Sequence, residues 1–259
     1  MQGSEIRNLV VVKMEEYTPY GPSSTPLLAG GDQLNEVKPV YSYIDQTLAE
    51  AANEILLIAP IHRIVSKEAD VMGIADKDDR RIGIIPMPTD FLRLHTLRMV
   101  GWSKPIHETI HEGDPAYSLQ FVRWTRGTKQ KPAATITGIG EAVKDTEGLV
   151  ENHFINLPYT EMDSEGYGPV NMEVDEEGFG HFADGCVLLH YYSVDAADLH
   201  QVREFKYIQC FDESRFYDRS VAEAIALNCA RKIYEIYGQT DQVNTLTNEL
   251  NAVIENLKK

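Results

Sequence analysis

Residues 218–238 read DRSVAEAIALNCARKIYEIYG, and this stretch has the clearest periodicity in the chain. Its larger apolar side chains recur at three- and four-residue steps, which is the spacing of one stripe along an α-helix. They are Val221, Ile225, Cys229, Ile233 and Ile236. Asp218 is a favoured helix N-cap and Gly238 a favoured helix stop, so we predict a helix that begins near Asp218 and ends at Gly238.

A second helix is predicted directly after Gly238, with Thr240 or Asp241 as its N-cap. Its apolar residues are spaced 3, 4, 3 and 4 apart, which makes a heptad stripe. They are Val243, Leu246, Leu250, Val253 and Leu257. Two heptads are too short to be stable alone, so the stripe needs a partner. The partner is either the preceding helix or another subunit, and the five residues are candidates for a subunit interface.

The first half of the chain combines one helix with β-structure. Residues 41–59 have helical periodicity and end before Pro60. Asp70–Ala75 and Ile82–Met87 flank a polar turn and predict a hairpin. Thr89 or Asp90 is expected to cap one short helical turn. The further predicted strands are Leu94–Val100, Ser118–Trp124, Ala133–Gly138 and Val187–Ser193.

These elements predict an α+β fold. A bundle of the helix at 41–59 and the two helices within 217–258 is expected to pack on an antiparallel sheet drawn from 70–138 and 187–210. Prolines and glycines between residues 15 and 40 predict an extended arm. The chain is therefore expected to divide as follows: 1–40, arm; 41–140, helix and sheet; 141–186, acidic loop-rich insertion; 187–259, strand and helical hairpin.

Charge is distributed unevenly along the chain. The net charge is −16, yet residues 141–213 alone hold 17 acidic against 3 basic residues, while residues 214–259 hold 6 of each. Such a block cannot grip duplex DNA, because phosphate binding depends on Lys and Arg. We interpret it as a solvated insertion, or as a surface next to a polyanion or a basic partner.

Composition points to a protein made in a reducing cytoplasm. The N-terminus lacks the layout of a signal peptide, and no apolar run approaches the ~18 residues of a membrane span. The three cysteines, Cys186, Cys210 and Cys229, are far apart and odd in number. This spacing favours buried thiols over a disulfide framework or a cysteine zinc site.

Residues 107–111, HETIH, match the H-E-x-x-H zinc pattern. The pattern works only on a helix, where His107 and His111 aim at one metal and Glu108 orients the attacking water. Pro105 and Pro115 leave too little room for such a helix. We interpret the match as accidental and predict an exposed strand here. No metal, cofactor or catalytic residue is predicted.

One cluster combines basic and aromatic residues, within FVRWTRGTKQKP at 121–132. Its members are Arg123, Trp124, Arg126, Lys129 and Lys131. The cluster can contact phosphate, but pairing with acidic regions of this chain or of a neighbour is favoured.

The order of elements is more specific than any single motif. A helix and a hairpin precede P-x-P-x-D-F-L-R-L at 86–94, followed by YSLQFVRW, KPAATI and the late helix at 218–234. This order resembles the head-to-tail adaptor or ring proteins of short-tailed bacteriophages, the group that includes tail tubular protein A, and most of all the ring proteins of crAss-like phages. It covers residues 41–138 and 187–237. The residues that carry it are Pro88, Asp90, Leu92 and Arg93.

The resemblance implies a structural virion protein rather than an enzyme. It implies a subunit of a dodecameric ring that contacts its own copies, the portal and other tail proteins, while DNA passes through without sequence-specific binding. The acidic insertion is not part of the resemblance, but an acidic surface facing a channel would repel DNA and let it slide, so we hypothesise that residues 141–213 face the channel. The alternatives are an acidic binding or assembly-chaperone module, and a zinc hydrolase using the HETIH residues.

Overall fold

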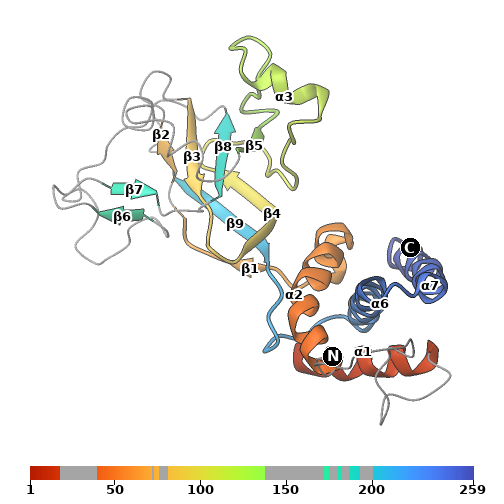
Figure 1. Ribbon diagram of the computed structural model, residues 1–259. Helices are drawn as coiled ribbons and strands as arrows, with labels where there is room; N and C mark the ends of the chain where they lie inside the picture. The colour runs from red at the N-terminus through yellow and green to blue at the C-terminus, as the bar shows by residue number, and fades with distance from the viewer. Residues whose placement is uncertain are drawn as a thin grey trace. The chain divides into compact units, whose positions relative to one another are not determined.

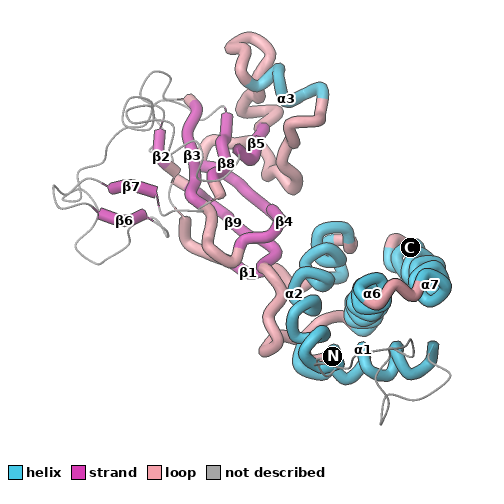
Figure 2. Tube along the Cα trace, in the orientation of Figure 1, coloured by secondary structure: helices cyan, strands magenta, loops and turns pink. Residues whose placement is uncertain are grey.

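The computed structural model divides into a helical unit and a β unit (Figures 1 and 2). The helical unit joins Met1–Val65 to Cys210–Lys259, and the β unit is Ser66–Gln209. This composition confirms the α+β class. The structure describes residues 1–17, 40–71, 73–75, 81–137, 172–174, 180–182, 187–192 and 201–259.

Helix α6 is the centre of the helical unit. The unit's α-helices are α1 (Gly3–Tyr17), α2 (Val40–Ile58), α6 (Arg219–Ile236) and α7 (Thr240–Leu257), and a 3-10 turn, η1, covers Ile61–Arg63. Helix α6 packs against each of the other three (Figure 1). Its alanines at 222, 224, 226 and 230 are fully buried. Small side chains let neighbouring backbones approach, so one helix serves three partners.

The predicted ends of α6 are confirmed. The Asp218 side chain accepts a hydrogen bond from the Ser220 backbone N–H at 2.9 Å, which caps the helix. At the other end Gly238 has φ +70°, a conformation that glycine adopts without strain. The predicted cap of α7 is wrong, because the N-cap is Gln239 and makes no side-chain hydrogen bond. Thr240 and Asp241 lie in the first turn instead.

The heptad stripe of α7 has its partner within the chain. Leu246, Leu250 and Leu257 are buried, and α7 packs on α6. Val243 and Val253 are only partly buried. The preceding helix is thus the partner of the stripe, and of the five candidates for a subunit interface only the two valines retain exposed surface.

The N-terminal prediction is wrong for the first 17 residues. They form α1 rather than an extended arm, because Ile6, Val10 and Met14 recur every four residues and are buried. The Tyr234 hydroxyl of α6 donates to the Met14 carbonyl oxygen at 2.7 Å. The prolines that suggested an arm begin only at Pro19. Residues 18–39, where the remainder of the arm was predicted, lie outside the described residues.

The β unit contains two larger antiparallel sheets rather than the single predicted one. Their orders are β1-β9-β4 and β2-β3-β8-β5, and β6 and β7 form a separate pair. The bounds are β1 Lys67–Glu68, β2 Ile74–Ala75, β3 Ile82–Pro86, β4 Phe91–Met99, β5 Ala133–Thr137, β6 Met172–Val174, β7 Gly180–Phe182, β8 Leu188–Tyr192 and β9 Val202–Gln209. Both larger sheets contribute to one core, which includes Ile85, Leu97, Leu189 and Tyr207.

Two local predictions in the β unit are wrong. Ser118–Trp124 is not a strand, because Pro115–Gln120 forms helix α3. Asp114 caps this helix and Pro115 starts it with a preset φ, and these signals outweigh the alternating pattern that follows. Thr89 and Asp90 form a turn that leads directly into β4 rather than a helical turn. The predicted hairpin is confirmed as the pair β2–β3.

Most of the acidic stretch, including residues 138–171, lies outside the described residues, and so does the expectation that it faces a channel. Among the described helices none is both long and apolar enough to cross a bilayer.

Candidate functional site

The HETIH segment lacks the geometry that zinc catalysis requires. Its backbone is irregular rather than helical or a regular strand, and two isolated β-bridges hold it, one at Ile106 directly before it and one at Ile110 within it. Ile106 exchanges backbone hydrogen bonds with Leu97 at 2.9 Å each. The His107 ring nitrogen Nδ1 lies 3.0 Å from the His95 carbonyl oxygen. The described parts of the chain contain no group of three or more metal-ligating side chains.

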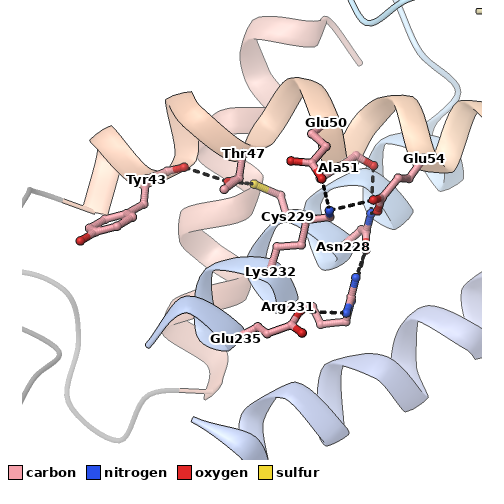
Figure 3. A network of polar contacts seen from close by, with 10 residues as sticks. All are labelled: Tyr43, Thr47, Glu50, Ala51, Glu54, Asn228, Cys229, Arg231, Lys232 and Glu235. Carbon is pink, nitrogen blue, oxygen red and sulfur yellow. Dashed lines mark hydrogen bonds and ion pairs between the residues drawn. The ribbon is translucent and has the colours of Figure 1, made fainter. Parts of the chain in front are cut away.

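A second candidate is the polar network between α2 and α6 (Figure 3). Asn228, which is 2% exposed, donates from its amide nitrogen to the Ala51 carbonyl oxygen at 3.0 Å and to Glu54 Oε2 at 2.9 Å. Its amide oxygen accepts hydrogen bonds from Arg231 at 3.2 and 3.0 Å. The whole amide is therefore satisfied within the chain, as a buried amide must be.

The charged members of this network also pair with each other. Lys232 Nζ lies 2.7 Å from a carboxylate oxygen of Glu50 and 2.7 Å from one of Glu54. Burial alone would raise the pKa of Glu54, but the hydrogen bonds from Lys232 and Asn228 hold it below its ordinary value. Both carboxylates are therefore paired with Lys232, and the lowered pKa of Glu54 favours its ionised form.

The one thiol in the network, that of Cys229, is buried. Burial raises the pKa of Cys229 to about 11, so the reactive thiolate is scarce at neutral pH. Its sulfur lies 3.3 Å from Thr47 Oγ1, which also donates to the Tyr43 carbonyl oxygen at 2.8 Å. The network fixes the register of α2 on α6.

The site that does face solvent is residues 115–131, which we call the cationic–aromatic loop. It starts with α3, stands beside β5 and β8 in the β unit, and returns into β5 (Figure 1). Four large apolar side chains on it are exposed: Leu119 (45%), Phe121 (62%), Val122 (48%) and Trp124 (88%). Arg123 lies between two of them in sequence, and its guanidinium carbon is 5.8 Å from the centroid of the Trp124 ring.

The loop presents these side chains from a well-ordered hydrogen-bonded frame. Gln120, which is 6% exposed, accepts from the Gly127 N–H at 2.9 Å and donates to the Ala116 carbonyl oxygen at 3.0 Å. The Thr125 hydroxyl donates to the Leu119 carbonyl oxygen at 2.8 Å. The bonds from Gly127 and Thr125 join the two arms of the loop.

The return of the loop is equally constrained. A Cβ atom at Gly127 would come within 2.9 Å of both the backbone nitrogen and the Cβ of Ala133, so only glycine fits without movement. Ser103 donates twice to the Lys129 carbonyl oxygen, at 3.0 Å from its N–H and 2.9 Å from its hydroxyl. The phenyl ring of Phe121 packs edge-on against Tyr117, with ring centroids 5.1 Å apart.

Charge distinguishes the loop from the remainder of the chain. Residues 115–131 contain four basic residues and no acidic one, whereas the whole chain has a net charge of −16. Arg123 and Lys131 are exposed, and Arg126 and Lys129 are partly exposed. The basic-aromatic cluster expected from sequence is thus brought together. The sequence did not predict that the apolar residues at 119, 121 and 122 are exposed beside these cations. The signal for it was the helix start at Asp114 and Pro115, which argues against a strand here.

The four residues that carry the resemblance lie at a corner of the β unit. Asp90 accepts hydrogen bonds from Lys67 Nζ at 2.8 Å and from the Tyr207 hydroxyl at 2.7 Å, which joins the start of β4 to β1 and β9. Burial opposes ionisation of Asp90, but the two donors lower its pKa below the ordinary value. Pro88 is buried just before it, while Leu92 and Arg93 lie half-buried on β4.

No protein-family model matches this sequence, and comparison with curated proteins yields no match. The functional assignment therefore depends on the residues of this chain.

Proposed function

We propose that this chain is a structural virion protein that forms a ring, dodecameric by its resemblance to connector proteins, between the portal and the tail of a short-tailed phage. Its partners are its own copies, the portal protein and other tail proteins. It is made in the host cytoplasm and resides in the virion. DNA passes through the ring without sequence-specific binding, in keeping with the acidic net charge of −16.

The cationic–aromatic loop is the observation that carries this proposal. Monomeric proteins rarely expose contiguous large apolar side chains, and such patches mark interaction sites. Trp, Phe and Arg are also the residue types enriched in protein interfaces. Because Gln120 and Thr125 hold the loop in shape, little conformational entropy is lost when a partner binds. These properties support a subunit whose function is assembly.

The element order gives a second, weaker support. Helix α2, the β2–β3 hairpin, the corner at Asp90, strand β5 and helix α6 follow one another along the chain, which is the order on which the resemblance depends. The YSLQFVRW segment departs from the expected pattern, since it begins on α3 and continues into the exposed loop.

Native mass spectrometry of the purified full chain, with and without a chelator, tests the proposal. A discrete cyclic oligomer of many subunits, without zinc mass, is the expected result. A monomer or dimer that captures a basic protein would favour the acidic binding module instead. A monomer that loses stoichiometric zinc to the chelator would favour the hydrolase, and in that case His107→Ala should abolish metal binding.

A further inference from the structure

We propose that residues 106–110 form a pH-sensitive strap, which is bound to the edge of β4 at neutral pH and leaves it when His95 takes up a proton. The inference does not rest on the proposed function. It assigns a role to His107, the first histidine of HETIH, in a hydrogen-bonded contact with β4.

The strap covers one edge of each of the two larger sheets. Among the described strands, β4 pairs only with β9 and β5 only with β8, so each has one edge without a strand partner. Ile106 exchanges backbone hydrogen bonds with Leu97 on the edge of β4, at 2.9 Å each. The Ile110 N–H donates to the Ala134 carbonyl oxygen on the edge of β5 at 2.8 Å. The strap therefore links the two sheets by backbone bonds at its two ends.

Three side chains add to the contact with β4. Thr96 is 4% exposed, and its hydroxyl oxygen lies 2.8 Å from His95 Nδ1 and 3.3 Å from His107 Nδ1. His107 Nδ1 also lies 3.0 Å from the His95 carbonyl oxygen. Two consecutive residues of β4 thus contact one imidazole of the strap.

The acceptors in this contact determine where its hydrogens lie. A carbonyl oxygen only accepts, so His107 Nδ1 carries a hydrogen, which it donates to His95 and shares with the Thr96 hydroxyl oxygen. The Thr96 hydroxyl then donates its own hydrogen to His95 Nδ1. This arrangement requires a neutral His95 whose hydrogen is on Nε2.

Protonation of His95 breaks this arrangement. Its Nδ1 would then carry a hydrogen and could no longer accept from Thr96. The Thr96 hydroxyl would already accept from His107, and its own hydrogen would lose its acceptor at a buried position. A buried donor without an acceptor is costly, so a charged His95 favours the state in which the strap has left β4 and water reaches Thr96.

The surrounding charges act in the same direction. Burial first, and then the positive charges of His107, Lys206 and Arg93, hold the pKa of His95 below its ordinary 6.5. Glu204 opposes them, but Lys206 Nζ lies 3.0 Å from its carboxylate. The charged groups that surround the contact are Arg93 and Arg98 from β4, Glu204 and Lys206 from β9, Glu68 from β1 through its ion pair with Lys206, and Glu108 from the strap.

The direction of the pH effect follows from this lowered pKa. Because His95 takes up a proton less readily when the strap is bound than when it is released, opening becomes more favourable as the pH falls below 6.5. Release uncovers the backbone N–H and carbonyl groups of Leu97. Uncovered groups of this kind on a sheet edge can pair with an added strand. The strap therefore makes access to the edge of β4 dependent on pH.

The test compares amide hydrogen exchange of the full chain at pH 7.5 and pH 5.0 by mass spectrometry, with each rate divided by the intrinsic rate at that pH. The variant is His95→Asn, which keeps an acceptor near the position of Nδ1 but takes up no proton. The control is His111→Asn, because His111 is exposed and lies beyond the strap. Circular dichroism at both pH values verifies the fold, and exchange at the histidine C2 positions of wild type measures the pKa of His95 without any variant.

In wild type and in the control, the peptides that contain Leu97 and Ile106 should exchange at least about threefold faster at pH 5.0 after this correction. The same peptides of His95→Asn should show no such rise. His95 should titrate below 6.5.

Each of three results would overturn the inference. A His95 that titrates at or above 6.5 would show that the bound strap does not disfavour its proton. An equal acceleration in His95→Asn would mean that another group responds to the pH. Loss of the wild-type circular dichroism signal at pH 5.0 would indicate general acid unfolding instead of release of the strap. The proposed function is tested separately by the mass of the oligomer and would be unaffected.

Discussion

The α2–α6 network and the cationic–aromatic loop each contain a buried side-chain amide that is hydrogen-bonded within the chain, but the two amides have different effects. In the network, the hydrogen bonds and ion pairs that Figure 3 shows for Asn228 and Lys232 join α6 to α2 or bond within α6. In the loop, the buried amide of Gln120 accepts a hydrogen bond from Gly127 and so supports a backbone on which Trp124 is exposed. Polar satisfaction in the first region stabilises the fold, whereas in the second it shapes a surface. Mutations should therefore affect stability in one region and association in the other.

The largest loss of stability is expected from Asn228→Ala in the network. The substitution removes two donors and an acceptor from a buried position and leaves Glu54 and Arg231 without that partner. We expect the free energy of unfolding to fall by about 2–4 kcal/mol, measured by urea denaturation. Asn244→Ala, at an exposed position on α7, is the matched control. Equal effects of the two substitutions would show that the network is not a stabilising unit.

Gly127→Ala should have the next largest effect, because it disturbs the frame of the loop. The new Cβ would lie 2.9 Å from the backbone nitrogen of Ala133, so the return of the loop into β5 must shift. We expect a loss of about 1–3 kcal/mol together with weaker self-association. Gly113→Ala is the control, since nothing lies within 4 Å of a Cβ there. If the two variants unfolded at the same temperature, the loop would accommodate the added methyl group at Gly127 without cost, and the prediction would be wrong.

Asp90 is intermediate between the two regions. Its side chain is partly exposed, yet it accepts hydrogen bonds from Lys67 and Tyr207. Its pKa in the folded state is below the ordinary 3.8, so its contribution to stability is present above about pH 4 and is lost as the pH falls through the folded pKa. Asp90→Asn should therefore lower the free energy of unfolding at pH 7 by about 0.5–1 kcal/mol and make little difference near pH 2. Urea denaturation at both pH values tests this, with the exposed Glu112→Gln as control. If wild type and Asp90→Asn still differed in free energy of unfolding at pH 2, the stabilisation by Asp90 would not come from its charge.

The smallest effect on stability is expected from Trp124→Ala. The side chain is 88% exposed, so its removal should change the free energy of unfolding of the dissociated subunit by less than about 0.5 kcal/mol. Urea denaturation of a dilute sample measures it. A loss above 1 kcal/mol would mean that the indole ring of Trp124 packs within the β unit. The proposed difference between the network, which stabilises the fold, and the loop, which mediates association, would then be wrong.

Local signals explain which elements the sequence could predict. Asp218 and Gly238 mark the ends of α6, and the periodicity of α2 ends at Pro60, so both helices were predicted nearly to the residue. The failures are local too. The prolines after residue 18 hid the stripe of Ile6 and Val10, and the alternation in SLQFVRW hid the helix that Asp114 starts.

Longer-range features were beyond reach from sequence. Strand β9 pairs with β1 and β4, which precede it by more than 100 residues, and β8 pairs with β3 and β5. Nothing local decides that these strands divide between two sheets. The basic-aromatic composition of the loop was visible, but its exposure depends on the bonds of Gln120 and on the fit of Gly127, which only the folded chain reveals.

The helical unit is discontinuous along the chain, and this matters while the protein is being synthesised. Helices α1 and α2 leave the ribosome early, but α6, against which both pack, begins roughly 160 residues after α2 ends. At ~5–20 residues per second, the apolar faces of α1 and α2 wait about 10–30 s for their partner. The β unit is contiguous and can form in that interval. Closure of the helical unit, by contrast, must wait for α6, and until then the apolar faces of α1 and α2 are available to a chaperone.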